Sequence, residues 1–432
     1  MKTVEYRGGG KLPRELAAFF ERPAFDPAAE RAAARVLAEI RREGDRAVAR
    51  WARRFDGLAL PPARWRVTEP EQRAAARAVD AATRRAVRQA RERIAAFARA
   101  GRRRDWSMPS GRGGEMGEQF SPLERVGVYV PGGAAPLAST ALMTVTPARA
   151  AGVREIAACT PCGPDGRVNP VLLYALAVAG ATEIYRLGGM QAIGALAYGT
   201  ATIRKVQKIV GPGGPYVTAA KRLVYGAVAL DLVAGPSEIA VLADDSAQPE
   251  QAAADLLSQL EHGTGQEKAL FVTTSRRLAA AVGAAVARQA RTLRRRPALA
   301  RALRRGLLAV VTPDLRLGLE VCERFAPEHL ELLVRRADAW RRRVRRAGAV
   351  FVGPWTPEAA GDYVAGPSHV LPTGGTAAMF SGLTVEDFRR RTSFMRFTRA
   401  DLRATRETIE TFGRLEGLEA HARAAAARFE QP

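Results

Sequence analysis

The spacing of apolar residues divides the chain into a helical beginning, a central alternation of strands and helices, and a helical end. In the first quarter, apolar positions from Ala28 through Ile40 to Trp51 recur at the three- and four-residue spacing of one helix face. A second amphipathic stretch covers residues 69–102. These patterns predict long helices, and the change to Gly, Ser and Arg at residues 109–114 predicts a loop or boundary.

From Val126 onward, short apolar runs alternate with helical segments. Such alternation is typical of parallel sheets covered by helices on both faces. The runs that we expect to form strands are 126–130, 155–159, 183–187, 206–210, 228–233, 238–243, 269–273, 307–311 and 349–352. Strands over this length fit two small sheets better than one, and the residues after Leu383 return to a helical pattern.

The charge of the chain does not by itself identify a partner. Its 67 Lys and Arg against 44 Asp and Glu give a formal charge of +23, which is compatible with a nucleic-acid-binding protein. The basic residues are nearly all Arg, however, and they are spread along the expected helices, as in residues 84–104 and 291–305. No nucleic-acid-binding motif accompanies them, so we expect no nucleic-acid partner.

Other features exclude membrane and secreted proteins. No run reaches the ~18 apolar residues that a membrane span needs. The N-terminal residues 1–7 lack the apolar segment of a secretory signal, and three cysteines cannot form a disulfide framework in 432 residues. We therefore expect a cytoplasmic protein with no membrane partner.

The four histidines stand in polar or Gly- and Pro-rich segments. A single histidine is most often a structural residue, but four such settings with Asp362 nearby indicate a metal and acid/base site. The segments are Gln259-Leu-Glu-His262, Pro-Glu328-His329-Leu, Gly-Pro-Ser-His369 and Glu416-Gly-Leu-Glu-Ala-His421.

The spacing and types of the candidate ligands favour zinc over other metals but do not identify the metal. Gln259 and His262 are three residues apart at the end of an expected helix, so their side chains leave the same face. With Asp362 and His421 they would form a mixed nitrogen and oxygen set that suits zinc and leaves open positions for a substrate. These ligands come from distant segments, and only a fold can join them.

Ordered along the chain, several segments resemble the histidinol dehydrogenase family from Pro122 to the C-terminus. The segments are Arg-Val-Gly-Val-Tyr129-Val-Pro-Gly-Gly, Gln191-Ala-Ile-Gly-Ala-Leu-Ala-Tyr-Gly-Thr, Ala-Gly-Pro-Ser237-Glu, Ser-Gln259-Leu-Glu-His262-Gly, Ala-Pro-Glu328-His329-Leu-Glu, Gly-Asp362-Tyr363, His369-Val-Leu-Pro-Thr and Glu416-Gly-Leu-Glu-Ala-His421. One such segment would be weak evidence, but their order together is highly specific.

The resemblance implies roles for individual residues. It implies an acid/base pair of Glu328 and His329. The residues implied to bind zinc are Gln259, His262, Asp362 and His421, and these, with Ser237, His329, His369 and Glu416, are implied to bind the substrate. The residues implied to bind NAD are Tyr129, Gln191 and the position of Gly214.

The resemblance also implies an activity and a fold. The activity is oxidation of L-histidinol through the aldehyde to L-histidine, which reduces two NAD and completes histidine biosynthesis, with one zinc per subunit. The fold is two incomplete Rossmann-like domains in a homodimer with shared active sites. The expected boundaries are an N-terminal extension (1–23), a first domain (24–126 and 239–383), a second domain (127–238) and a C-terminal helical extension (384–432).

Two departures from the family pattern leave the substrate open. Gly214 replaces a usual Asn that contacts NAD, and Ser368 replaces a usual Asn before His369. No zinc ligand and neither acid/base residue is changed. The alternatives are a dehydrogenase of the same fold that oxidises another alcohol, because fold and motif do not fix a substrate, and a basic binding protein that has lost catalysis.

Overall fold

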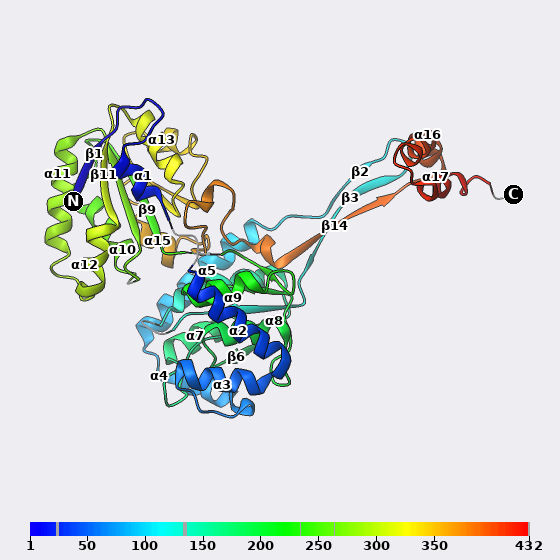
Figure 1. Cartoon of the computed structure of the whole chain (residues 1–432), viewed down its shortest axis with the longest axis horizontal. Helices are drawn as coiled ribbons and strands as arrows, with labels where there is room; N and C mark the ends of the chain where they lie inside the picture. The colour runs from blue at the N-terminus through cyan, green and yellow to red at the C-terminus, as the bar shows by residue number, and fades with distance from the viewer. Residues whose placement is uncertain (23–25, 133–135, 234, 263, 431–432) are drawn as a thin grey trace. The chain divides into compact units, whose positions relative to one another are not determined.

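The chain forms two compact units, each built around its own sheets. The computed structural model describes residues 1–22, 26–132, 136–233, 235–262 and 264–430. The first unit contains residues 1–101 and 124–388, and the second contains residues 102–123 and 389–432. Two parallel sheets lie in the first unit, which confirms the expected α/β class (Figure 1). Among the residues described, no helix combines the length and apolar character needed to cross a bilayer.

The larger sheet has six strands that are all parallel. Their order is β1 (Lys2–Glu5), β11 (Leu307–Val311), β10 (Lys268–Thr273), β9 (Glu238–Ala243), β12 (His329–Leu333) and β13 (Ala349–Val352). β9 is central and fully buried, and its alternate side chains enter two different cores. Ile239 and Val241 face one core, while Ala240 and Leu242 face the other, as the two-residue period of a strand requires.

Helices cover both faces of this sheet, as Figure 1 shows. One face is covered by α10 (Pro249–Leu260), α11 (Arg276–Gln289) and α12 (Arg296–Arg305), and the other by α1 (Arg14–Phe20) and α13 (Leu315–Phe325). Shorter elements follow the last two strands and carry the chain onward: α14 (Ala337–Arg341), α15 (Glu358–Tyr363), η2 (Thr376–Ala378) and η3 (Val385–Phe388).

The second sheet has five parallel strands. Their order is β6 (Glu183–Tyr185), β5 (Glu155–Cys159), β4 (Arg125–Tyr129), β7 (Lys208–Val210) and β8 (Ala229–Leu230). The helices that alternate with these strands are α6 (Ala138–Ala151), α7 (Pro170–Ala179), α8 (Gly189–Tyr198) and α9 (Pro215–Leu223).

The N-terminal helices complete the layers of the five-stranded sheet. They are α2 (Pro27–Glu43), α3 (Asp45–Asp56), η1 (Pro62–Arg64), α4 (Glu69–Ala78) and α5 (Ala81–Ala100). Val36 and Trp51 share one core with Ile193 and Ile209 of that sheet and its helices. Packing therefore groups these helices with the second expected domain, whereas the sequence analysis groups residues 24–126 with residues 239–383. Amphipathic spacing shows that a helix has an apolar face but does not show which sheet covers it.

The apolar pattern does not predict five of the described strands, which are β1, β2 (Trp106–Pro109), β3 (Glu115–Pro122), β12 and β14 (Arg389–Arg396). β1, expected as part of an extension, is the edge strand of the six-stranded sheet, where Val4 is buried. β12 begins at His329, and Glu328 immediately precedes it. β14 carries six charged or polar side chains on a largely exposed strand and so has no apolar run to reveal it.

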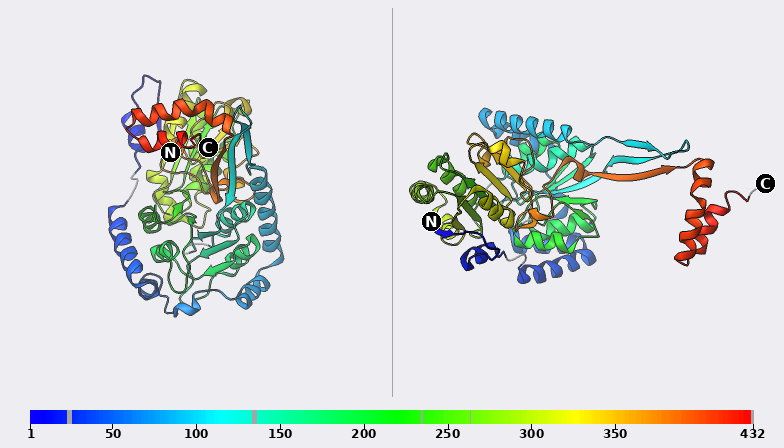
Figure 2. Two further views of the ribbon diagram at one scale, coloured as in Figure 1. Left: turned by 90° about the vertical axis from the view of Figure 1, so that its right-hand side faces the viewer. Right: turned by 90° about the horizontal axis from the view of Figure 1, so that it is seen from above.

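The second unit is an antiparallel sheet followed by two helices. Its strand order is β14, β3 (Glu115–Pro122) and β2 (Trp106–Pro109). Figure 2 shows α16 (Arg399–Leu415) and α17 (Glu419–Ala426) beyond the end of β14. The Asp401 carboxylate accepts hydrogen bonds from Ser110 Oγ at 2.6 Å and from the N–H of Arg112 at 3.0 Å, which ties α16 to the loop between β2 and β3. The expected helical extension is thus a strand and two helices joined to residues 102–123.

Candidate active site

The candidate catalytic residues lie at the amino ends of two neighbouring strands of the six-stranded sheet. His329 is the first residue of β12, and its register partner Ile239 is the second residue of β9. Ser237 and Glu328 immediately precede these two strands. Because α10 runs back from the end of β9, its last turn brings Gln259 to the same edge of the sheet.

The backbone of Glu238 holds both members of the acid/base pair. His329 Nδ1 lies 3.0 Å from the backbone oxygen of Glu238, and because a carbonyl oxygen can only accept, Nδ1 carries the proton. The N–H of Glu238 donates to Oε2 of Glu328 at 3.0 Å. His329 Nε2 is therefore the ring nitrogen with a free lone pair, as a proton acceptor requires.

Burial sets the protonation of this pair. Both residues are almost completely buried, with 3% of His329 and 6% of Glu328 exposed. Burial lowers the pKa of His329 to about 4, which keeps the ring neutral near pH 7. Burial also raises the pKa of Glu328 well above the usual glutamate range, although the N–H of Glu238 opposes this change.

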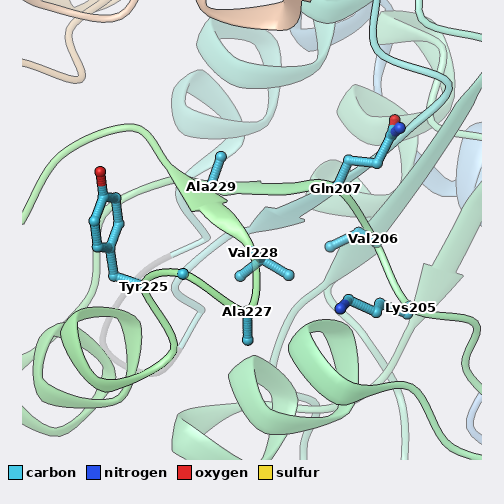
Figure 3. A pocket seen from close by; sticks show the side chains of 8 residues that line it. Lys205, Val206, Gln207, Tyr225, Ala227, Val228 and Ala229 are labelled. Carbon is cyan, nitrogen blue, oxygen red and sulfur yellow. The ribbon is translucent and has the colours of Figure 1, made fainter. Parts of the chain in front are cut away.

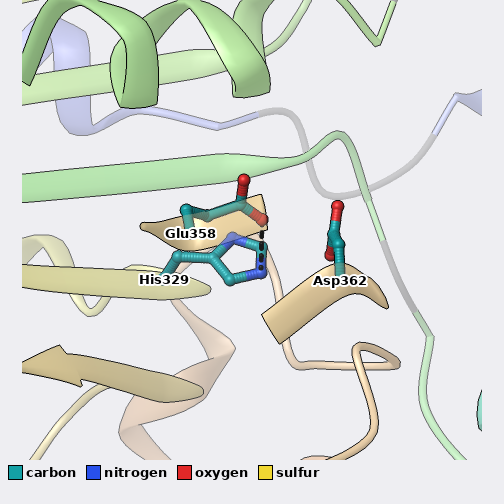
Figure 4. A group of neighbouring side chains, drawn as sticks. All are labelled: His329, Glu358 and Asp362. Atoms are coloured by element: carbon teal, nitrogen blue, oxygen red, sulfur yellow. Dashed lines mark ion pairs between the residues drawn. The ribbon is translucent and has the colours of Figure 1, made fainter. Parts of the chain in front are cut away.

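Glu358 is a site residue that the sequence analysis does not identify. Its Oε1 lies 3.7 Å from His329 Nε2, and its Oε2 accepts a hydrogen bond from Ser258 at 2.9 Å. Burial, and then the charge of Asp362, raise the pKa of Glu358 to about 8. Figure 4 shows the side chains of His329, Glu358 and Asp362 as neighbours. One possible ligand atom from each of the three lies within 4.8 Å of the other two. The available signal was the four-residue spacing of Glu358 and Asp362, which places both carboxylates on one side of α15.

Asp362 and His369 form a pair beside this cluster. Asp362 Oδ1 lies 3.4 Å from His369 Nδ1, and His369 Nε2 lies 3.3 Å from Thr140 Oγ1 on α6. Burial acts to raise the pKa of Asp362, but the hydrogen bond and charge of His369 outweigh burial, and the pKa is lowered. The carboxylate of Asp362 is thus kept ionised, as a metal ligand must be.

Gln259 and His262 occupy the end of α10 as the sequence analysis expects. Gln259 is completely buried, yet neither atom of its side-chain amide has a hydrogen-bond partner among the described residues. His262 Nδ1 lies 3.0 Å from the backbone oxygen of Gln259, so Nδ1 donates and the lone pair is on Nε2. A buried amide without a partner and an oriented imidazole are both suited to bind a metal ion.

The residues expected to bind a dinucleotide lie at the carboxyl edge of the five-stranded sheet, which is the usual cofactor edge of such sheets. Tyr129 ends β4, and its hydroxyl accepts from the N–H of Gly189 at 3.1 Å at the start of α8. Burial raises the pKa of Tyr129 to about 12. Gln191 Nε2 donates to Asp56 at 2.7 Å, while its Oε1 has no partner among the described residues.

A cavity of about 460 Å³ opens beside Gln191. It is lined by Ala32, Arg35, Val36, Trp51, Arg54, Phe55, Gly189, Met190, Gln191 and Tyr216. Gly214 precedes α9, and a Cβ built on it would meet no atom within 4 Å. The glycine at this position is therefore not required by packing, and the larger residue usual in the family would fit.

Another cavity, of about 660 Å³, lies away from all the candidate residues. Figure 3 shows its lining by Lys205, Val206, Gln207, Tyr225, Ala227, Val228 and Ala229, beside β7 and β8. No candidate catalytic, metal or cofactor residue lines it, so volume alone does not locate the chemistry in this chain.

The first unit thus brings together Ser237, Gln259, His262, Glu328, His329, Asp362 and His369 at or beside one sheet edge. The remaining two candidates belong to the second unit. Glu416 follows the last residue of α16 and His421 lies on α17, and both side chains are exposed within that unit. Gly417, with φ of 68°, turns the chain between them.

Comparison with known proteins gives consistent results. The family model for histidinol dehydrogenase matches residues 21–429. A histidinol dehydrogenase of Moorella thermoacetica is 48% identical over 389 residues, covering 90% of this chain and 92% of the relative. One from Geobacillus kaustophilus is 44% identical over 431 residues and covers 100% of both chains. The crystal structure of histidinol dehydrogenase from Elizabethkingia anophelis has a TM-score of 0.94 at 34% identity, covering 100% of this chain and 98% of that chain.

Proposed function

The chain belongs to the histidinol dehydrogenase family of oxidoreductases, and we propose that it oxidises L-histidinol through L-histidinal to L-histidine, reducing two NAD per turnover. Membership in the family implies a role in histidine biosynthesis. The observation that carries the proposal is the orientation of His329, whose Nδ1 donates to Glu238 and whose Nε2 is left as the acceptor.

Two residues divide the proton transfers. His329 Nε2 takes the proton of the substrate hydroxyl in the first oxidation, since the buried ring is neutral and carries its one N–H proton on Nδ1. Glu328 activates water for attack on the aldehyde before the second oxidation. Its position supports this role, because it is adjacent to His329 and is held by the same backbone residue.

The donor set at the end of α10 fits a zinc ion. Gln259, His262 and Asp362, with His421, are the residues that would hold it. The support is the completely buried amide of Gln259, because a buried polar group without a partner costs about 1–3 kcal/mol unless a ligand satisfies it. Zinc, one ion per subunit, would supply a fixed point that orients the amino and imidazole nitrogens of the substrate.

The carboxyl edge of the five-stranded sheet fits NAD, which would accept the hydride. Tyr129, Gln191 and the backbone at Gly214 are the residues that would bind it. The support is the unpartnered Oε1 of Gln191 beside the cavity of about 460 Å³. Tyr129 positions the start of α8 through its hydroxyl, so its contribution includes the shape of the loop that contacts the cofactor.

The substrate is proposed to lie between the first unit of one chain and the second unit of another. Ser237 and His369 would contact it from the first unit, and Glu416 would accept from its imidazole N–H. The exposure of Glu416 and His421 within their unit leaves both side chains available to a partner subunit. We propose a homodimer with shared active sites, in which both residues are supplied in trans.

Measurement of NADH formed from L-histidinol, with and without a zinc chelator, tests this function. We expect two NADH per histidinol consumed and loss of turnover on chelation. Turnover of other alcohols but not histidinol would instead support a same-fold dehydrogenase, which the changes at Gly214 and Ser368 leave open. Ser368 Oγ donates to the backbone oxygen of Met143 at 3.1 Å, so this residue has a structural contact of its own.

A further inference from the structure

Glu238 is connected to both proposed acid/base residues and to a charged residue far away in the sequence. Its backbone N–H and C=O hold Glu328 and His329, as described above. Its side chain, on the first residue of β9, forms an ion pair with Arg22, which follows α1. Only 3% of the Glu238 side chain and 11% of the Arg22 side chain are exposed.

Arg22 also contacts the segment that leads into the acid/base pair. Its Nη2 donates to the backbone oxygen of Phe325 at 2.8 Å, and its guanidinium lies 3.9 Å from the centre of the Phe325 ring. Phe325 ends α13, three residues before Glu328. One guanidinium therefore joins the start of β9 to the end of α13. The first segment carries the backbone of Glu238, and the second leads to the side chains that this backbone binds.

The turn that Arg22 braces is strained. Ala326, between Phe325 and Glu328, has φ of 44°, and Arg336 is the only other non-glycine residue with positive φ in the described part of the chain. A non-glycine residue in this left-handed region is strained and persists only where its surroundings hold it. The chain therefore enters Glu328 through a backbone conformation that needs support from neighbouring contacts.

We propose that Arg22 and Glu238 are positioning residues, and that their ion pair fixes the backbone of Glu238 so that Glu328 and His329 keep their orientation. The inference rests on the proposed roles of Glu328 and His329. The pair faces a separate cavity of about 320 Å³, lined also by Lys268 and Thr373 but not by either acid/base residue. Arg22 therefore acts through Glu238 and not by touching the reacting groups.

Removal of one charge alone would leave an unpaired charge in the interior and would destabilise the fold. An effect on the orientation of the acid/base residues could then not be separated from a loss of stability. The informative change is the double variant Arg22→Met/Glu238→Gln, which removes both charges and keeps similar volumes. The matched control is Arg125→Met/Glu183→Gln, which removes a buried pair at 2.6 Å at the amino edge of the five-stranded sheet. Thermal melting of all variants shows how much stability each pair contributes.

We expect kcat of the Arg22/Glu238 double variant to fall by about 10²-fold, with KM changed less than about twofold, because misplacement of a base by about 1 Å has an effect of this size. The control should melt at a lower temperature and keep the wild-type kcat per folded molecule. A role in stability alone would make kcat of the two double variants alike and close to wild type.

A spectroscopic readout makes the test independent of turnover. The chain has four histidines, so the Nδ1–H signal of His329 is assigned by its loss in His329→Asn in protein carrying nitrogen-labelled histidine. We expect this N–H to be protected from solvent exchange in wild type and the control and to exchange rapidly in the Arg22/Glu238 double variant. Wild-type kcat with a protected N–H in that variant would overturn the positioning role alone. Full activity of His329→Asn would overturn the proposed function, and the positioning role with it.

Discussion

His329 Nε2 lies 3.7 Å from Oε1 of Glu358, and no hydrogen-bond donor among the described residues reaches that oxygen. Burial and the charge of Asp362 raise the pKa of Glu358 to about 8, and a positive charge on the His329 ring 3.7 Å away would favour the ionised form of this carboxyl. Glu358 is therefore placed to stabilise His329 after proton transfer from the substrate, as the carboxylate does in other histidine-dependent sites.

Replacement of Glu358 should lower the rate of chemistry. For Glu358→Gln we expect kcat to fall by about 10²-fold with a smaller change in KM, since the carboxylate acts on the protonated ring that forms during reaction. The control is Ser258→Ala, which removes the hydroxyl 2.9 Å from Glu358 Oε2 but keeps the carboxylate. Equal kcat for Glu358→Gln and wild type would contradict this role.

Substitutions of the two acid/base residues should affect the two oxidation steps differently. Glu328→Gln should spare the oxidation of histidinol to the aldehyde more than oxidation of the aldehyde, because only the second step uses activated water. His329→Asn should slow both steps by about 10²-fold or more. Single-turnover rates with histidinol and with histidinal check this, and equal losses in both steps for Glu328→Gln would count against the division.

Zinc removal should abolish turnover without unfolding the protein. Both parallel sheets have extensive buried cores that contain none of the proposed metal ligands, so the fold should not depend on one ion. Chelated protein should keep its far-UV circular dichroism and its affinity for NAD and regain activity on addition of zinc. Loss of the helical signal on chelation would show that the ion also holds the fold.

Active sites shared between subunits should be detectable by complementation. His329→Ala and His421→Ala chains should each be inactive, and their co-expression should restore roughly a quarter of wild-type activity, because about half of the dimers are mixed and each has one intact site. If one chain supplies the complete site, every site carries a lesion and the mixture stays inactive.

Glu71 should contribute stability that is lost in acid. Arg186 Nη2 lies 2.8 Å from both carboxylate oxygens of Glu71, and this hydrogen bond is the main cause that lowers the pKa of Glu71 to about 2. The folded pKa is below the unfolded value, so the contribution is complete above about pH 4.5 and is lost as the pH falls toward about 2. We expect about 1 kcal/mol, because 44% of the carboxylate side chain is exposed and screened.

The measurement is urea unfolding of wild type and Glu71→Gln between about pH 6 and about pH 3. The difference in unfolding free energy should narrow as the pH falls. Glu69→Gln is the matched control, since Glu69 lies on the same helix turn but its side chain is 84% exposed and pairs with Arg73 at 3.2 Å on the surface. A constant difference across this range would mean that Glu71 acts through packing rather than charge.

The sequence by itself determined the local elements and the residue types of the site. The periods of apolar residues predicted helices such as α2 and strands such as β9, because each period reports which side of one element is buried. The motifs around His262 and His329 indicated the candidate chemistry because a motif consists of residues that are neighbours in the sequence, and it can be recognised without the fold.

Only the tertiary structure decided which segments meet. β1 pairs with β11 about three hundred positions later, and α2 covers the five-stranded sheet, because strand pairing and the burial of an apolar face depend on partners that no local period identifies. The same reason hid Glu358 and Glu238, whose importance lies in the atoms that face His329 from other elements. The protonated nitrogen of His329 was likewise decided by one backbone oxygen on a neighbouring strand, a contact that exists only after the sheet has formed.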